Sequence, residues 1–269
     1  MAIVHNLAGT IREKVITEVM IPEIRKALVA RNVVTVKEDL LATKSIKIWG
    51  VGDVTTSAWD GGVITYSDHT NSAIDLLMNK GSQFGQTTNN VDTTGAAEDV
   101  LSSVIGSGTY KMGIDIDTAV FAEMLTTTKT GTDIAVVDET NVAGLFTEAQ
   151  VLADNAGFPD AGRDMTVTPE VASALGEVVA GLGNDALSGE AQRTGYVGFY
   201  KGFSIYKSTN LPAGTNSIAS MPSATVLGLG YSTVDASDVP NQPQVKSYGA
   251  IQFGVELVKE EFVIKFLTE

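Results

Sequence analysis

Few side chains in this sequence are of the types that perform chemistry. The two histidines, His5 and His69, have no acidic residue or cysteine at the spacing of a metal site or a catalytic triad. Asp115 and Asp117 could serve glycoside hydrolysis, which needs two carboxylates about 5–10 Å apart. Side chains at positions i and i+2 of a helix point apart, however. We therefore predict no catalytic residue and no metal site, and we interpret both histidines as surface residues.

No cofactor site is indicated either. The sequence has no phosphate-binding loop of the Walker type, and Gly195, Gly198 and Gly202 lack the strand-then-helix setting of a dinucleotide loop. We interpret these glycines as turn and packing residues. Trp49 and Trp59 are conceivable as a sugar-binding platform, but a role as anchors in a subunit interface is more economical. The sequence therefore predicts binding surfaces rather than a reaction centre.

Composition limits the class of protein. The chain has 269 residues, 43% of them hydrophobic, with no cysteine and no visible secretory signal. Disulfides and thiolate metal sites are excluded, and no apolar run of about 18 residues is present to span a membrane. The length favours one elaborated domain or two interlocked lobes. Stability must then come from packing and association.

The net charge of −14 is unevenly distributed. Residues 1–43 carry six basic and five acidic side chains, whereas residues 44–269 carry twelve basic and twenty-seven acidic ones. Proteins that bind duplex nucleic acid do so mainly through clustered Lys and Arg, and the acidic part of this chain has no such cluster. The charge is typical of a soluble protein that does not bind DNA tightly.

Residues 1–43 have the features of an arm. Thr10 and Glu13 match a capping box, and Ile11 and Val15 begin the apolar stripe of a short helix that Pro22 interrupts. Pro22 can itself open a second short helix. Isolated helices shorter than roughly 12–15 residues are marginal in water, so we expect both to lie on another surface.

Residues 44–92 change to the alternation of strands. Ile46 and Ile48 begin this pattern, and the runs 53–59 and 63–67 flank Asp60, Gly61 and Gly62, which predict a hairpin with a tight glycine turn. A two-stranded hairpin is at best marginally stable by itself. We therefore expect it to pack against another surface, which a neighbouring subunit could supply.

A long helix is predicted from Thr94 to about Met124. Its apolar residues recur at helical spacing, and its glycines at 106, 108 and 113 each lower helix propensity by about 1 kcal/mol relative to alanine. We expect a bend or an interruption there. This is the longest helix that the sequence predicts.

The remaining residues alternate between short helices and strands. Thr147 and Gln150 match a capping box for a helix that ends at Gly157, and Thr168 caps a helix that begins at Pro169. The other predictions are strands at 164–167, 203–208, 224–229 and 255–267, and loops at 181–193 and 235–244.

Two stretches carry a recognisable order of residues. The first has Pro159, Gly162 and Arg163 in a turn, then the strand and Pro169 at the helix start. The second consists of Gly195, Gly198, Gly202, Phe203, Ile205, Tyr206, Ser208, Asn210, Leu211 and Pro212. In this joint order the chain resembles the major capsid proteins of tailed phages, which have the Hong Kong 97-type fold.

The resemblance implies an α+β fold with four parts. It implies an N-terminal arm at 1–43, an extended β-hairpin loop at 44–92, a peripheral domain at 93–131 and 250–269, and an axial domain at 132–249. The long helix would be the family's spine helix, and the hairpin would lie over the adjacent subunit. We therefore take Trp49, Trp59, Asp60, Gly61, Gly62, Ile11 and Val15 as candidate intersubunit contacts.

The resemblance also implies a mechanical function, without an enzyme activity or a cofactor. Subunits would form pentamers and hexamers of an icosahedral shell in the virion, assembled in the host cytoplasm around double-stranded DNA. Implied partners are other copies, a portal, a separate scaffolding protein and a decoration protein. Two alternatives remain open, an encapsulin-type nanocompartment shell and, from another class, an acidic hydrolase or carbohydrate-binding module.

Overall fold

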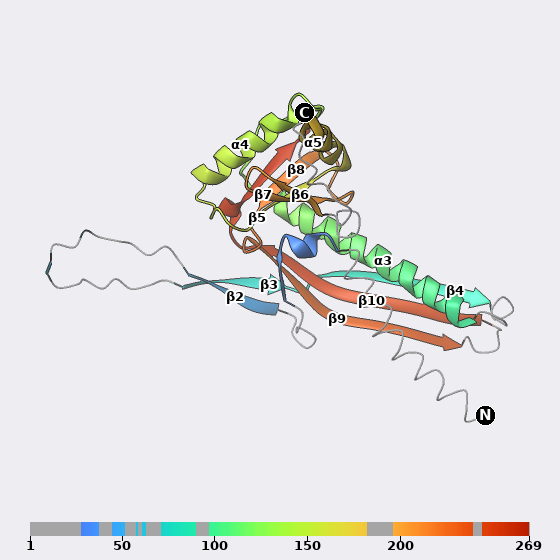
Figure 1. Ribbon diagram of the computed structural model, residues 1–269. Helices are drawn as coiled ribbons and strands as arrows, with labels where there is room; N and C mark the ends of the chain where they lie inside the picture. The colour runs from blue at the N-terminus through green and yellow to red at the C-terminus, as the bar shows by residue number, and fades with distance from the viewer. Residues whose placement is uncertain are drawn as a thin grey trace.

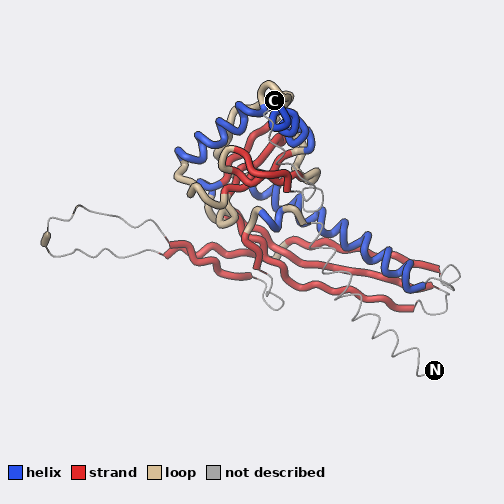
Figure 2. The backbone as a smooth tube through the Cα atoms, in the orientation of Figure 1, coloured by secondary structure: helices blue, strands red, loops and turns tan. Residues whose placement is uncertain are grey.

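The computed structural model describes residues 28–37, 45–51, 58, 61–62, 71–89, 97–181, 196–238 and 244–268. These residues form an α+β fold with a broad upper lobe, a long lower body and a projecting hairpin (Figures 1 and 2). The helices are η2 (Ala30–Asn32), α3 (Ala97–Met124), α4 (Val142–Asn155), α5 (Pro169–Gly181) and η4 (Glu260–Phe262). The strands are β1 (Thr35–Lys37), β2 (Ser45–Val51), β3 (Asn71–Leu77), β4 (Lys80–Asn89), β5 (Arg163–Val167), β6 (Tyr196–Tyr200), β7 (Phe203–Lys207), β8 (Thr215–Ser220), β9 (Thr225–Asp238), β10 (Gln244–Leu257) and β11 (Val263–Leu267).

Three sheets organise the described residues. A four-stranded sheet has the order β1-β9-β10-β4, a five-stranded sheet has the order β11-β8-β5-β7-β6, and β2 pairs only with β3. Helix α3 runs along the four-stranded sheet, and α4 and α5 lie in the lobe with the five-stranded sheet (Figure 1). No helix in the described part of the chain is long and apolar enough to cross a membrane.

Helix α3 confirms the predicted long helix and its apolar face. Ile105, Met112, Ile116 and Val120 are buried against the sheet or the lobe. The expected interruption is wrong, because the helix is continuous over 28 residues. The reason is visible at Gly108, where an added Cβ would lie 2.5 Å from the Phe84 ring. This glycine makes room for a neighbouring strand and does not break the helix.

We expect Gly108→Ala to destabilise the subunit by about 1–3 kcal/mol, because overpacking against Phe84 outweighs the gain in helix propensity. The matched control is Gly144→Ala in α4, where an added Cβ meets nothing within 4 Å. That variant should be stabilised by up to about 1 kcal/mol. Urea unfolding of unassembled subunits measures both changes, and a stabilised Gly108→Ala would contradict the packing argument.

The sheets cross the predicted domain boundaries. Strand β4 lies within the predicted hairpin region, yet it pairs antiparallel with β10 along its whole length. Strand β9 belongs to the same four-stranded sheet, although residues 132–249 were predicted to form the axial domain. Strand β11 pairs with β8 in the five-stranded sheet instead of joining α3. Which strands pair depends on contacts between residues far apart in the sequence, and the order of elements along the chain does not specify these contacts.

The hairpin of β2 and β3 leaves the body at one side (Figure 1). Ser45 pairs with Leu77 and Val51 with Asn71, a register that is centred on Gly61. Gly61 has φ +89°, as a tight glycine turn requires. The observed pairing joins residues 45–51 to residues 71–77. The predicted runs 53–59 and 63–67 fall outside the described residues, except for Ala58. Buried Leu76 and Met78 anchor the base of the hairpin against Val226.

Helix α4 begins five residues before its predicted start. Thr147 is inside the helix, where its Oγ1 donates to the Ala143 carbonyl. The start is instead organised by Asp138, whose Oδ1 accepts hydrogen bonds from the N–H groups of Thr140 and Asn141. The predicted end at Gly157 is confirmed. Gly157 has φ +75°, and the Phe158 N–H donates to the Ala153 carbonyl as in a Schellman motif.

Most of the predicted strands are present, with shifted ends. The strand before Thr168 and the helix start at Pro169 are confirmed. Between β6 and β7, Lys201 (φ +46°) and Gly202 (φ +89°) form a two-residue turn of the hairpin type. The predicted loop at 235–244 is wrong at both ends, since Asp235 pairs with Tyr248 in the β9–β10 ladder and Gln244 begins β10. The predicted loop at 181–193 lies almost entirely outside the described residues.

The end of the predicted arm is part of the body. Leu28, Ala30, Val33 and Val34 are buried in the main core, and β1 pairs parallel with β9. The two predicted arm helices lie outside the described residues, apart from Leu28. Residues 28–37 are therefore packed into the body of the subunit and are not part of a separate arm.

Candidate functional site

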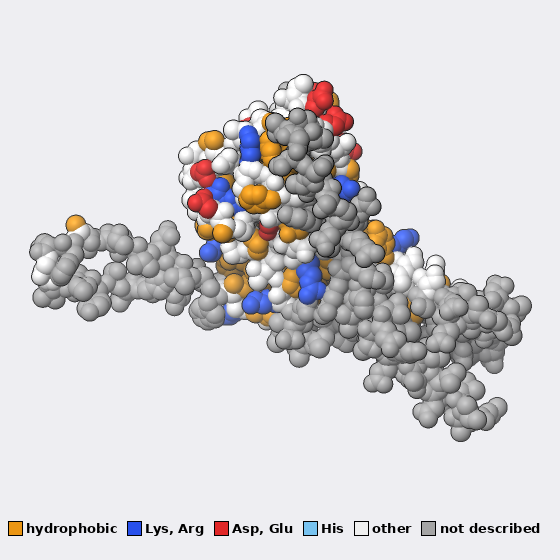
Figure 3. Space-filling view, viewed as in Figure 1, with side chains coloured by type: hydrophobic (Ala, Val, Ile, Leu, Met, Phe, Trp, Pro, Cys, Tyr) orange, Lys and Arg blue, Asp and Glu red, His pale blue; other side chains and the backbone are white. Residues whose placement is uncertain are grey.

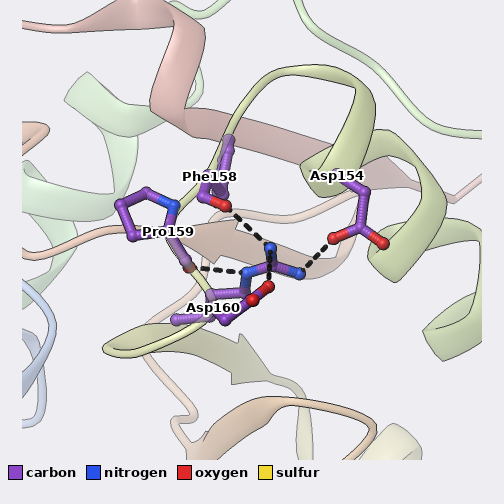
Figure 4. Close-up of polar contacts among 5 residues, drawn as sticks. Asp154, Phe158, Pro159 and Asp160 are labelled. Carbon is purple, nitrogen blue, oxygen red and sulfur yellow. Dashed lines mark hydrogen bonds and ion pairs between the residues drawn. The ribbon is translucent and has the colours of Figure 1, made fainter.

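The first residues of interest are those of the Pro-Gly-Arg turn. Arg163 opens β5, and its side chain is only 4% exposed. Its Nε donates to the Pro159 carbonyl, and one of its terminal nitrogens donates to the Phe158 carbonyl, both at 2.8 Å. The two terminal nitrogens also meet Asp154 at 2.7 Å and Asp160 at 3.1 Å (Figure 4). The guanidinium therefore joins the end of α4, the turn and β5.

This network explains the other signature residues of the turn. Gly162 has φ +81°, a conformation that residues with a Cβ rarely adopt, so the chain can reverse into β5 there. Pro159 supplies one of the two carbonyls that Arg163 binds. The sequence predicted this turn, but the ion pair with Asp154, which is in the preceding helix, had no signal in the sequence.

A second junction is centred on Asp117 in α3. Its side chain is buried, and its oxygens accept hydrogen bonds from the Val29 N–H at 3.0 Å and the Ala30 N–H at 3.1 Å. The Asn210 amide donates to the same carboxylate at 3.2 Å. Burial raises the pKa of Asp117 to about 6, although all three hydrogen bonds oppose this shift. One carboxylate thus ties the chain before β1 and the loop after β7 to the long helix.

Asp117 and Asp115 lie in different surroundings. Asp115 is exposed and accepts a hydrogen bond from the Ser82 hydroxyl of β4. Asp117 is buried among backbone donors, so the two side chains serve different neighbours, as expected for residues two apart in a helix. The described residues contain no group of three His, Cys, Asp or Glu side chains that could hold a metal.

Asp164, next to Arg163, is a second buried carboxyl. It is 5% exposed, and desolvation raises its pKa to about 7. Its strand neighbours are Ser204 in β7 and Ser220 in β8, and the Ser220 hydroxyl is itself buried without a hydrogen bond. Sequence reasoning placed Asp164 in a strand but had no signal for its burial.

The aromatic and glycine signature residues form the hairpin of β6 and β7. Phe203 is fully buried in the core, and Gly202 completes the turn. Gly198 lies where the register of the two strands shifts, with φ +152°. Lys201 binds α4 through the Thr147 hydroxyl and the Ala143 carbonyl. These residues have structural roles, while Gly195 lies outside the described residues.

The candidate intersubunit residues are only partly described. Trp49 is in β2, where its backbone pairs with Ala73 on β3. Gly61 and Gly62 are exposed. Trp59, Asp60, Ile11 and Val15 lie outside the described residues, as do both histidines. The structure therefore places the hairpin but leaves its contacts as predictions.

The described surface carries no basic patch on the face in Figure 3. On this face, the Lys and Arg side chains of the described residues lie apart from one another, on the upper lobe and on the body below it. Several large hydrophobic side chains are exposed, namely Leu77, Tyr110, Val136, Val151, Phe199 and Tyr248.

Comparison with solved structures identifies the fold. A structure from Mycobacterium phage Che8 matches with TM-score 0.68 at 19% identity, covering 89% of this chain and 90% of that one. The capsid of cyanophage P-SCSP1u matches with TM-score 0.65 at 15% identity, covering 87% and 86%. The capsid of a native GTA particle matches with TM-score 0.65 at 13% identity, covering 90% of both chains.

No family model and no curated protein matches the sequence. The likeness in structure nevertheless extends over nearly the whole chain, and it shows that this chain shares its α+β fold with phage capsid structures. The fold expected from the order of the Pro-Gly-Arg and Gly-aromatic stretches is confirmed at this level.

Proposed function

We propose that this chain is the major capsid protein of a tailed phage, and that its copies assemble as pentamers and hexamers into an icosahedral head. The observation that carries the proposal is the match with capsid structures over about nine-tenths of the chain in both directions. The fold neighbours named as capsids favour a phage head over a nanocompartment or a hydrolase. The proposed role is mechanical, and no catalytic step is assigned to any residue.

The projecting hairpin supports this proposal. In the described part, β2 pairs only with β3, and the hairpin is anchored to its own subunit by the small cluster at its base. An isolated two-stranded ribbon is marginal in water, so a neighbouring subunit is the natural source of further packing. We propose that the hairpin lies over the adjacent subunit, with Trp49, Trp59, Asp60, Gly61 and Gly62 at the contact, and with Ile11 and Val15 of the arm at a second one.

The domain division is also proposed, in a revised form. We keep an arm at the N-terminus, a hairpin loop, a peripheral domain and an axial domain. The peripheral domain gains β4, β9 and the first residues of β10, because these strands form one sheet beside α3. The axial domain consists of α4, α5 and the five-stranded sheet, including β11.

Other partners follow from the same proposal. The net charge of −14 supports enclosure of double-stranded DNA without sequence-specific binding. A portal and a separate scaffolding protein are proposed for assembly in the host cytoplasm, with a decoration protein on the finished virion. Co-expression of this chain with each partner, or analysis of the proteins present in purified particles, tests whether the partner takes part in assembly.

The direct test of the function is assembly of the purified chain. Sedimentation and electron microscopy should find rings or closed shells of megadalton mass, because arm and hairpin need neighbouring copies for full packing. A chain that stays monomeric at all concentrations and with scaffold supplied would contradict the proposal.

A hairpin variant tests the proposed contact. Replacing residues 53–67 with a short Gly/Ser link should leave subunit unfolding unchanged, because the main core lies in α3 and in the two larger sheets. Shell yield should fall to background. Trp59→Ala is the milder variant, since loss of a large aromatic from an interface costs several kcal/mol, about 2–4. Unfolding of the subunit by the deletion, or normal shells without the hairpin, would show that the hairpin is not an intersubunit clamp.

A further inference from the structure

Strand β4 is an open edge of the four-stranded sheet. Among the described residues, no strand pairs with its outer side. Its ten residues pair with β10 from Lys80 opposite Phe253 to Asn89 opposite Gln244 without a shift in register. The edge is therefore long and regular, and its outward N–H and C=O groups can receive another strand.

Protection that is usual at sheet edges is missing from β4. Such edges are normally short, bulged, or supplied with proline or charged side chains that prevent pairing with other chains. β4 has no proline, and its one charged residue, Lys80, is at its first position with Nζ 3.4 Å from Glu123. By contrast, β9 extends beyond its described pairing with β1 and carries Asp235 and Asp238 there, and β6 has only five residues with a register shift. Of these edges, β4 is the one suited to strand addition.

A groove runs beside this edge, between β4 and α3. It has a volume of about 280 Å³ and is lined by Ser82, Gln83, Phe84, Gly108, Lys111, Met112, Ile114 and Asp115. Phe84 and Met112 make its apolar part, while Lys111 and Asp115 are exposed on α3. A strand added to β4 would cover an apolar surface as well as backbone groups.

We infer that β4 pairs antiparallel with β4 of a second copy, so that the sheet continues across a twofold axis. Lys111 and Asp115 carry opposite charges one helical turn apart. A twofold axis places Lys111 of each copy near Asp115 of the other, which gives two attractive pairs from one arrangement. The strand itself is neutral beyond Lys80, so self-pairing brings no like charges together.

The contacts within one subunit also set the register. Phe84 lies against Gly108, and Ser82 binds Asp115, so the midpoint of Lys111 and Asp115 lies beside Ser82 and Gln83. The twofold axis therefore passes near Gln83. Gln83 is exposed and pairs with Ala250 on β10. In the paired sheet, Gln83 of one copy lies opposite Gln83 of the second copy. Thr87 is four residues away on the same face of the strand, so the two Thr87 side chains do not lie opposite each other. The inference rests on the proposed function, which supplies the second copy.

The test uses the absence of cysteine from the chain. Gln83→Cys introduces a single thiol that should form a disulfide dimer on oxidation, because opposite residues in an antiparallel pair have Cβ atoms about 4.5–5.5 Å apart. Thr87→Cys is the matched control on the same strand and should give at least about tenfold less dimer, since the two thiols are then roughly 25 Å apart. Adding Lys111→Glu to Gln83→Cys should lower dimer yield about two- to fivefold.

The measurement is made on assembled particles and on unassembled subunits by non-reducing electrophoresis. Particles that form with Gln83→Cys but give no dimer overturn the β4 pairing and leave the proposed function standing. Equal dimer from Thr87→Cys also overturns it, because the contact is then not in the inferred register. If the wild-type chain forms no particles, the proposed function fails separately, and dimer formation by soluble subunits still decides the pairing.

Discussion

Replacing Arg163 by methionine is expected to lower the free energy of unfolding of the unassembled subunit by about 2–5 kcal/mol. The guanidinium is 4% exposed and satisfies the carbonyls of Phe158 and Pro159. Methionine fills much of the same volume but donates no hydrogen bond, so both carbonyls lose their partner. The carboxylates of Asp154 and Asp160 are exposed and can return to water, so they add little to the cost.

The variant Arg163→Lys distinguishes the contribution of the positive charge from that of the planar guanidinium. Lysine keeps the cation but cannot present the planar fork that reaches two carbonyls and two carboxylates at once. We expect it to recover about half of the lost stability. Lys207→Met on the neighbouring strand is the control for loss of an exposed cation, with an expected change within about 0.5 kcal/mol. Urea unfolding decides the matter, and equal stability of Arg163→Met and wild type would show that the turn does not depend on the guanidinium.

Asp164→Asn should make the subunit more stable than wild type at pH 8, by about 2–4 kcal/mol. Burial raises the pKa of Asp164 from 3.8 to about 7. The folded state therefore binds a proton that the unfolded state has released, and the stability of wild type falls as pH rises from about 4 through 7. Asparagine is neutral throughout and avoids the cost of burying a charge.

The dependence on pH is the sharper part of this prediction. The advantage of Asp164→Asn over wild type should grow by about 1–3 kcal/mol between pH 5 and pH 8, and then level off. Unfolding by urea at a series of pH values measures it. A difference that stays constant with pH would mean that Asp164 does not titrate in this range.

Asp117→Asn provides the contrast. Its pKa is also raised by burial, to about 6, but its carboxylate accepts hydrogen bonds from Val29, Ala30 and Asn210. An amide nitrogen in place of one oxygen would face these donors. We therefore expect no stabilisation from Asp117→Asn at pH 8, in spite of the similar direction of the two pKa shifts.

Much of the local structure was predictable because its causes are local. The long apolar stripe of α3, the start of α5 at Pro169 and the end of α4 at Gly157 depend on residues within one or two turns of each other. The order of the turn at Arg163 and of the Gly-aromatic hairpin was enough to indicate the fold that the comparisons then supported.

The errors fall where competing local signals were present. Thr147 and Gln150 fit a capping box, yet α4 begins at Val142, because the turn around Asp138 supplies a start earlier in the chain. The glycines of α3 predicted an interruption, yet the helix is continuous, and the Phe84 ring occupies the space that a side chain at Gly108 would need. Polar residues at 235–238 resembled a loop, yet β10 pairs with them.

The sequence by itself determined the classes of element, the acidic and cysteine-free composition and the resemblance to a known shell-forming fold. Backbone preferences, caps and turn glycines act over a few residues, so a single sequence records them directly. The tertiary structure alone decided that Asp117 meets Val29 and Asn210, 88 and 93 residues away, and that β4 pairs with β10 and with no other strand of the described residues. Strand pairing, the desolvation of Asp164 and the burial of Arg163 depend on which distant segments close around a residue, and that is settled only when the whole chain packs.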